Sequence, residues 1–467
     1  MVSKRFLSLL SGTLLTCAMT VQAEQPMDLL EIYDLALKND AQLAAARASW
    51  KASTEVVPQG RAALLPNISM SANTADNRSS QLVSTPLSNV GGAGDRTNNW
   101  NSHGWSATLR QPLFNLESWF NFERAEALSE QARIQFSVEQ QNLIMRVSEA
   151  YFNVLRAQDN LATAKAEEKA VKRQLDQTRQ RFEVGLIAET DVYEAKAAYD
   201  AARVTRIQGT NDVEVALENL TTITNVGVPA IAQMDKRMPV NTPVPAIAQE
   251  WVNTAIAQNL TLEAARKGVN VAEEQLRVSK SGHAPTLNAV ATYSHINDPS
   301  TANATLGWNG KSNNTVYGLE LSMPIFSGGA TSSKVRESGY RLEESQQTVD
   351  LTLRQTTTNA RNLYRTVNTD VDRIEARCQG IVSARSALKA TESGYEVGTR
   401  NIVDVLNAQQ VLYSAQRDYF NARYDFIINT LKLKQTAGTL SPEDLQALNE
   451  WMTGNPEEGM TVPVCTG

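Results

Sequence analysis

Residues 182–197 read FEVGLIAETDVYEAKA, and residues 395–410 read YEVGTRNIVDVLNAQQ. Each stretch has an aromatic residue, then Glu-Val-Gly and, six residues after the glycine, Asp-Val. The offset between the two stretches is constant at 213 positions, as from Gly185 to Gly398. Glycine at such a place ends a helix and lets the chain fold back. The sequence therefore predicts two equivalent helical hairpins.

Other blocks repeat in the same order along the chain. Residues 43–66 match residues 262–285 at an offset of 219. RQPLF at 110–114 aligns with SMPIF at 322–326 at an offset of 212. Tyr151 then aligns with Tyr364 at 213. The small shifts in offset fall between blocks, where loops absorb length. We interpret the chain as an internal duplication.

This duplication predicts five segments. They are a signal peptide over 1–23, a first repeat over 24–225, a Pro-rich linker over 226–247, a second repeat over 248–437 and a C-terminal segment over 438–467. Within each repeat we expect a helix, two strands separated by a loop, a very long helix, a turn and a returning helix.

The N-terminus carries an export signal. Lys4 and Arg5 precede an apolar run that ends in Val-Gln-Ala, which predicts a secretory signal peptide cleaved after Ala23. A lipoprotein signal through Cys17 is the weaker alternative, because Thr16 is a poor residue before a lipidated cysteine.

The bulk composition excludes several classes of protein. With 44 Lys+Arg and 50 Asp+Glu the net charge is −6, which argues against a nucleic-acid binder. No later apolar run is long enough for a transmembrane helix. An exported chain of this kind is periplasmic, secreted or inserted in the outer membrane as a barrel.

Cys378 and Cys465 are too far apart to indicate a disulfide framework, so we expect a packed or unpaired thiol at each.

Segments after the prolines at 66 and 285 alternate with a period of two. The apolar positions of the first and last segments are Ile68, Met70, Ala72, Tyr317, Leu319, Leu321 and Met323. Such segments suit a membrane barrel with a wet lumen, although an antiparallel sheet on a soluble core alternates in the same way. The export signal favours the barrel, with polar loops over 77–99 and 296–314. Four strands cannot close a barrel and unpaired edges in lipid are forbidden, so we expect an oligomer.

Residues 118–181 contain neither proline nor glycine and follow a heptad spacing. The seam positions are Leu143, Val147, Ala150, Val154, Ala157, Leu161, Ala164, Val171, Leu175 and Phe182, interrupted only by Glu168 and Thr178. Sustained heptads predict a coiled-coil seam, and roughly 60 residues give a rod of about 90 Å. The second repeat has the same pattern over 332–394.

Three stretches carry a family resemblance. RQLDQTRQRFEVGL at 173–186, GHAPTLN at 282–288 and GYEVGTRNIVDVLNA at 394–408 resemble the TolC family of outer-membrane channels. The resemblance covers nearly the whole mature chain, and the two turns place it near the centre of that family rather than among its distant efflux relatives. It implies an α+β membrane protein in which three protomers give four strands each to one 12-stranded barrel. The helices would continue the barrel as a periplasmic tube, with the linker and C-terminal segment around its equator.

In this family the second hairpin bends inward to close the tube, held by polar links to the first. The resemblance implies that Arg400 and Tyr395 reach Asp191, with Thr190 nearby. A simpler role for Asp191 is to stabilise the start of its helix. Arginine and tyrosine occur in only one copy, the one that must move, which favours the gate. The two roles can coexist.

The resemblance also implies a pore constriction and a docking tip. Asp404 would point into the closed pore and form a ring of three carboxylates. Close relatives have a second aspartate one turn later, whereas this chain has Asn407, which weakens the expectation of a strong multivalent-cation site. The tip residues that would meet a periplasmic adaptor are Arg181, Val184, Gly185, Leu186, Val397, Gly398 and Thr399. Plain turn chemistry explains the glycines equally well, but not their neighbours.

The sequence offers no enzyme chemistry. It has only three histidines and no phosphate loop, metal-spaced cluster or nucleophile motif, so we predict no catalytic residue, metal or cofactor. The resemblance instead implies a passive duct in the outer membrane that extends into the periplasm. An adaptor and an inner-membrane transporter of the RND, MFS or ABC type would recruit it, for drug efflux or type I secretion. The alternative is a periplasmic coiled-coil scaffold without a pore, which explains the rods but not the alternating strands.

Overall fold

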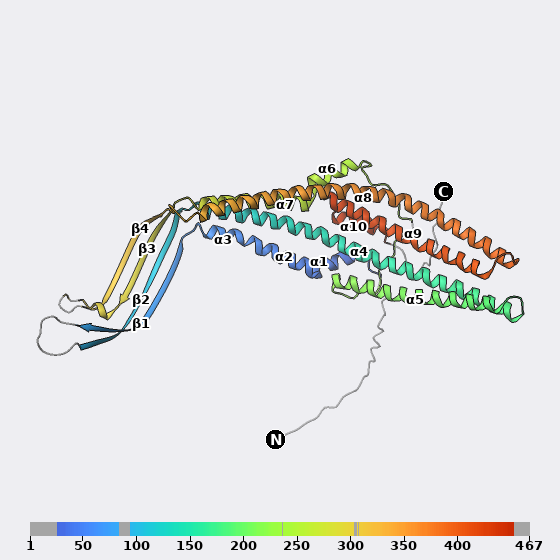
Figure 1. Cartoon of the computed structure of the whole chain (residues 1–467), viewed down its shortest axis with the longest axis horizontal. Coiled ribbons are helices and arrows are strands. Elements are labelled where there is room, and N and C mark those ends of the chain that lie inside the picture. The colour runs from blue at the N-terminus through green and yellow to red at the C-terminus, as the bar shows by residue number, and fades with distance from the viewer. Residues whose placement is uncertain (1–25, 84–93, 236, 303–305, 307, 453–467) are drawn as a thin grey trace, which may run out of the picture.

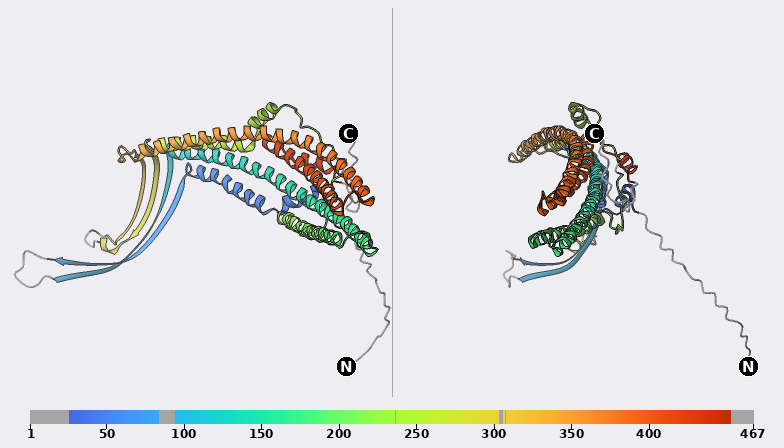
Figure 2. Two further views of the ribbon diagram at one scale, coloured as in Figure 1. Left: turned by 45° about the vertical axis from the view of Figure 1, so that its right-hand side comes forward. Right: turned by 90° about the vertical axis from the view of Figure 1, so that its right-hand side faces the viewer.

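The molecule is elongated, with strands at one end and two helical hairpins at the other (Figure 1). The computed structural model describes residues 26–83, 94–235, 237–302, 306 and 308–452. In the end-on view the long helices form one curved layer (Figure 2). Among the described residues, no helix is both long and apolar enough to cross a membrane.

The two halves contain corresponding elements in the same order. The first half consists of α1 (Leu29–Asn39), α2 (Ala41–Thr54), α3 (Val56–Ala62), β1 (Asn67–Val83), β2 (Gly94–Phe114), α4 (Leu116–Glu183) and α5 (Glu189–Thr224). The second half consists of α6 (Ala248–Gln258), α7 (Leu260–Ser281), β3 (Thr286–Asn297), η1 (Pro299–Thr301), β4 (Lys311–Ser322), α8 (Ala330–Glu396) and α9 (Ile402–Ala437), followed by α10 (Pro442–Asn449).

The single first helix predicted for each half is divided. Asp40 caps α2 by accepting a hydrogen bond from the backbone N–H of Leu43 at 2.6 Å. Asn259, 219 positions later, caps α7 by accepting from the N–H of Leu262 at 2.9 Å. A further break separates α2 from α3, because Pro58 has no N–H to bond the carbonyl one turn earlier. These caps and the proline place the helix boundaries.

The four strands form one antiparallel sheet in the order β1-β2-β3-β4. One row across the sheet joins Ile68, Leu109, Ala291 and Tyr317, so one face is apolar. The opposite face is polar. On it the hydroxyls of Ser71 and Ser106 lie 2.9 Å apart, those of Thr108 and Thr292 lie 3.2 Å apart, and Arg110 pairs with Glu320 at 2.8 Å. The predicted two-faced sheet is confirmed.

The strands differ from the prediction in length. β1 has 17 residues and β2 has 21, so both continue into the segment predicted as the loop over 77–99. Residues 84–93 of that loop lie outside the described residues. β4 ends at Ser322, one residue before Met323. Met323 is therefore outside the strand to which we assigned it, because Pro324 follows and cannot donate to a ladder.

The long helices exceed the predicted length. α4 has 68 residues and α8 has 67, which is about 100 Å each at the rise of an α-helix. Each packs against its returning partner, α4 against α5 and α8 against α9. Most predicted seam positions of α4 are buried, but Phe182 is 41% exposed. Thr178, which seemed to break the seam, is fully buried because its hydroxyl donates to the carbonyl of Gln174 at 2.8 Å.

A hydrophobic core lies where α1, α4, α9 and α10 meet beside the middle of the rods (Figure 1). Two tyrosines at equivalent positions fasten the linker to the rods. Tyr151 of α4 donates its hydroxyl to the carbonyl of Ala232 at 2.6 Å, and Tyr364 of α8 donates to the carbonyl of Ala246 at 2.6 Å. The linker therefore rests on both long helices.

One cysteine expectation is wrong. Cys378 on α8 is disulfide-bonded rather than a packed or unpaired thiol. Cys17 and Cys465, the other two cysteines of the chain, lie outside the described residues. The expectation rested on sequence separation, which does not determine the state of a single cysteine.

Candidate functional site at the hairpin tips

Both hairpins turn on a glycine in the left-handed region. Gly185 has φ 75° and Gly398 has φ 79°, values that favour glycine. At each turn a backbone N–H returns to the end of the long helix: Leu186 donates to the carbonyl of Arg181 at 2.9 Å and Thr399 to that of Gly394 at 2.8 Å. The duplicated sequence thus builds one turn twice.

The apolar residues at the turns have no partner within the described protomer. Val184, Leu186 and Val397 are all largely exposed at the outermost point of the tips. Exposed apolar side chains grouped in this way mark an interaction surface. Their placement agrees with the predicted docking role, which stays a prediction.

The returning helices begin differently in the two copies. Ala188 precedes α5 and provides no side-chain cap. Asn401 precedes α9 and accepts a hydrogen bond from the N–H of Asp404 at 2.8 Å, while Asp404 accepts from the N–H of Asn401 at 3.3 Å. This capping box gives Asp404 a local structural role. Asp191, at the equivalent place in α5, has no side-chain hydrogen bond or ion pair within the described chain.

The predicted link between Arg400 and Asp191 is absent from this protomer. Arg400 instead lies 3.9 Å from Asp404, four residues later on its own hairpin. Arg400 is well exposed and Asp404 only partly buried, so this pair contributes little to stability. Thr190 is exposed, and Asp191 is partly buried at the start of α5. The gate assignment of these residues stays a prediction.

Apolar contacts join the two hairpins near the tips. Ile402, the first residue of α9, is 1% exposed and packs with Leu175 of α4 and Ala195 of α5. Sequence reasoning missed Ile402. The available signal was the contrast with Glu189, which occupies the equivalent position 213 residues earlier.

Arg181 and Tyr395 also connect the hairpins. The guanidinium carbon of Arg181 lies 4.9 Å from the centroid of the Tyr395 ring, within the range of a cation–π contact. The Tyr395 hydroxyl is buried and has no hydrogen-bond partner within the described protomer. The ring, rather than the hydroxyl, therefore makes the contact seen here.

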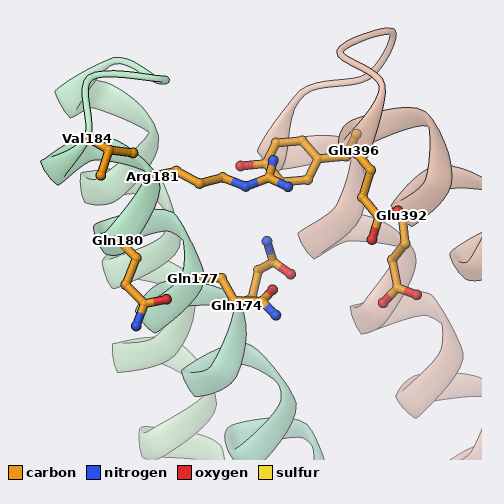
Figure 3. Close-up of a pocket in the computed structure, with 8 residues that line it drawn as sticks. Gln174, Gln177, Gln180, Arg181, Val184, Glu392 and Glu396 are labelled. Atoms are coloured by element: carbon orange, nitrogen blue, oxygen red, sulfur yellow. The ribbon is translucent and has the colours of Figure 1, made fainter.

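A groove of about 580 Å³ separates α4 from α8 just behind the tips (Figure 3). Its lining residues are Gln174, Gln177, Gln180, Arg181, Val184, Glu392, Tyr395 and Glu396. Arg181 extends across from one ribbon toward the other, between Val184 and Glu396 (Figure 3). The groove is polar and carries both charges, so it suits a partner surface better than a small apolar ligand.

The candidate constriction lies at the start of α9. Asp404 is partly buried, and Asn407, three residues later, is exposed. Spacing of three residues puts both side chains on one face of the helix. Among the described residues, no group of three or more His, Cys, Asp and Glu side chains could hold a metal ion.

Comparison with known proteins gives concordant findings. The sequence profile of the family described as Outer membrane efflux protein matches residues 32–226 and 251–439. Outer membrane protein TolC of Vibrio cholerae serotype O1 is 36% identical over 439 residues, covering 94% of this chain and 96% of that protein. Alkaline protease secretion protein AprF of Pseudomonas aeruginosa is 30% identical over 424 residues, covering 90% and 86%.

A solved structure has the same fold. The outer membrane protein VceC of Vibrio cholerae superposes with a TM-score of 0.72 at 17% identity. The superposition covers 88% of this chain and 96% of that one.

Proposed function

Because this chain belongs to the family of outer membrane efflux proteins, we propose that it is the passive exit duct of a tripartite efflux or type I secretion system. It lies in the outer membrane and extends into the periplasm as a homotrimer. A periplasmic adaptor and an inner-membrane transporter recruit it. It is not an enzyme, since its family and fold are those of a passive channel.

The observation that carries this proposal is the sheet. Within the described residues it has an apolar face, a polar face and two unpaired edges, at β1 and β4, and it leads into the long helices α4 and α8. Three sheets of four strands make a closed barrel of twelve, with the apolar faces toward lipid and the Arg110–Glu320 pair in the lumen. We retain the repeat boundaries 24–225 and 248–437 within this proposal, since each repeat supplies two strands and one hairpin.

The closed state of the duct depends on the second hairpin. In the assembled trimer, Arg400 and Tyr395 would link to Asp191, with Thr190 beside it. The free carboxylate of Asp191 supports this role, because the equivalent Asp404 already bonds the backbone of its own helix. Asp404 would form a single carboxylate ring, and Asn407 leaves the second ring uncharged.

The turn residues would form the adaptor-docking tip. Val184, Leu186 and Val397 support this role by their exposure at the end of the hairpins. Arg181, Gly185, Gly398 and Thr399 shape the turn or the groove behind it. The adaptor would present a helical hairpin to these tips.

The scaffold alternative is tested by reconstitution. The purified mature chain should form a trimer in detergent, with heat-modifiable mobility in gels, and should conduct ions across a planar lipid bilayer. A chain that stays soluble without detergent and never conducts would be a scaffold. The sheet favours the channel, because Leu319, Leu321 and Tyr317 are all strongly exposed on one face of β4.

A further inference from the structure

We propose that Arg181 is an additional gate residue, whose guanidinium holds the second hairpin closed through the ring of Tyr395. This inference rests on the proposed duct function. In this inference Arg181 has two roles, because it lines the docking groove and also belongs to the gate. Tyr395 then acts through its ring as well as through its hydroxyl.

The geometry joins two different hairpins. Arg181 is in the last turn of α4 and Tyr395 is in the last turn of α8, with 4.9 Å between the guanidinium carbon and the ring centroid. Tyr395 also packs against the apolar cluster of Leu175, Ala195 and Ile402. The Tyr395 ring therefore has apolar contacts on one side, and the guanidinium of Arg181 lies on another side.

The duplication makes this contact one-sided. The equivalent of Tyr395 in the first copy is Phe182, which is exposed, and the equivalent of Arg181 in the second copy is Gly394. A Cβ atom at Gly394 would lie 2.8 Å from Cγ of Arg400, so the glycine leaves room for the stem of that arginine. Gly394 has no side-chain cation to place over the Phe182 ring, so the duplication does not repeat the contact of Arg181 with Tyr395.

The charges around Arg181 fit this role. Glu392 and Glu396 line the same groove, yet Arg181 forms no ion pair within the described protomer. Stacking on a ring uses the face of the guanidinium and leaves the N–H groups at its edge free to donate. A partner that enters the groove therefore meets the residue that holds Tyr395.

The expected effect is moderate for one protomer and larger for the trimer. A partly exposed cation–π contact shifts a local equilibrium by about two- to fivefold. If three contacts must open together, the closed-to-open ratio changes by roughly tenfold to a hundredfold. Loss of the contact should therefore be visible in single-channel recordings.

The test is a double-mutant cycle in planar bilayers. Arg181→Gln should raise the open probability of the trimer in the parent and in the Tyr395→Phe background, because both keep the ring. In the Tyr395→Leu background, Arg181→Gln should add nothing. Arg181→Lys, which keeps a cation, should restore part of the closure. Arg179→Gln removes an exposed positive charge two residues away and should match the parent.

Two results would overturn the inference. One is an Arg181→Gln trimer that assembles normally and records like the Arg179→Gln trimer. The other is an equal effect of Arg181→Gln in the leucine and phenylalanine backgrounds, which would indicate a charge effect without the ring. If the parent trimer itself never conducts, the duct proposal fails, and this inference with it.

Discussion

The two halves of the chain keep the same supports and differ at the hairpin tips. Asp40 and Asn259 cap equivalent helices, and Tyr151 and Tyr364 donate to the linker at the same distance of 2.6 Å. These shared contacts lie away from the tips. In that part of the molecule each copy has to supply the same wall of the tube.

At the tips the copies differ at several positions, and three of these lie side by side at the start of the returning helix. The second copy has Ile402 where the first has Glu189, and Asn401 where the first has Ala188. Ile402 is buried against the first hairpin, whereas Glu189 accepts a hydrogen bond from the exposed Tyr193 at 2.9 Å. The third of these positions is Arg400, where the first copy has Ile187. The residue at the start of α9 therefore packs against the other hairpin, whereas the equivalent Glu189 is hydrogen-bonded within its own helix.

The largest expected effect tests the faces of the sheet in the two copies. Leu321→Arg should cost about 2–4 kcal/mol if the site lies near the membrane midplane, because it places a charge on the apolar face. The amount of trimer recovered from outer membranes should fall sharply. Ser322→Arg should be tolerated, since Arg110 already occupies the equivalent position, 212 residues earlier, on the polar face. Equal tolerance at both positions would refute the assignment of the faces.

The next effect tests the packing of Ile402 against the first hairpin. Ile402→Ala should cost about 2 kcal/mol of tip packing, the lower end for a buried isoleucine, because the cluster is small and close to water. Hydrogen exchange at the first turns of α9 should speed up, and channel opening should increase. Glu189→Ala, at the equivalent position of the first copy, should change neither quantity. Matching behaviour of the two variants would mean that the hairpins are held in the same way.

A smaller effect tests the helix starts. Asn401→Ala should remove the cap of α9 and cost about 1 kcal/mol. Ala188→Asn should give α5 the cap that it lacks and stabilise its first turn by a similar amount. Amide exchange at Asp404 and Asp191 should therefore move in opposite directions. Slower exchange at Asp404 in Asn401→Ala would contradict the capping box.

Much of this architecture could be predicted from the sequence, because its signals are periodic. Alternation predicted the two-faced sheet, and the heptads predicted the seam from Leu143 to Leu175. The prediction for Phe182 was wrong because this residue lies in the last turn of α4, beside the hairpin turn, and periodicity does not show where a seam ends. The prediction that Thr178 interrupts the seam was wrong, because a hydroxyl that is hydrogen-bonded to its own helix can be buried like an apolar group.

The candidate site was less predictable, because its contacts join elements that are distant in the sequence. The tips could be located from the glycines, yet the cation–ring contact of Arg181 with Tyr395 spans 214 positions and has no local signal. The disulfide state of Cys378 also had no local signal in the sequence. The capping box at Asn401 did have a local signal, an N-cap residue followed three positions later by a carboxylate.

The central claim is that polar links of the second hairpin hold a passive duct closed, and single-channel conductance tests it most directly. The double variant Arg400→Ser with Tyr395→Phe removes links worth on the order of 1 kcal/mol or less each in every protomer. The buried seams stay intact, so the trimer should assemble normally and conduct several-fold more than the parent. Charge reversal, Arg400→Asp with Asp191→Arg, should restore part of the closure. A double variant that assembles as a trimer and conducts like the parent would contradict the account.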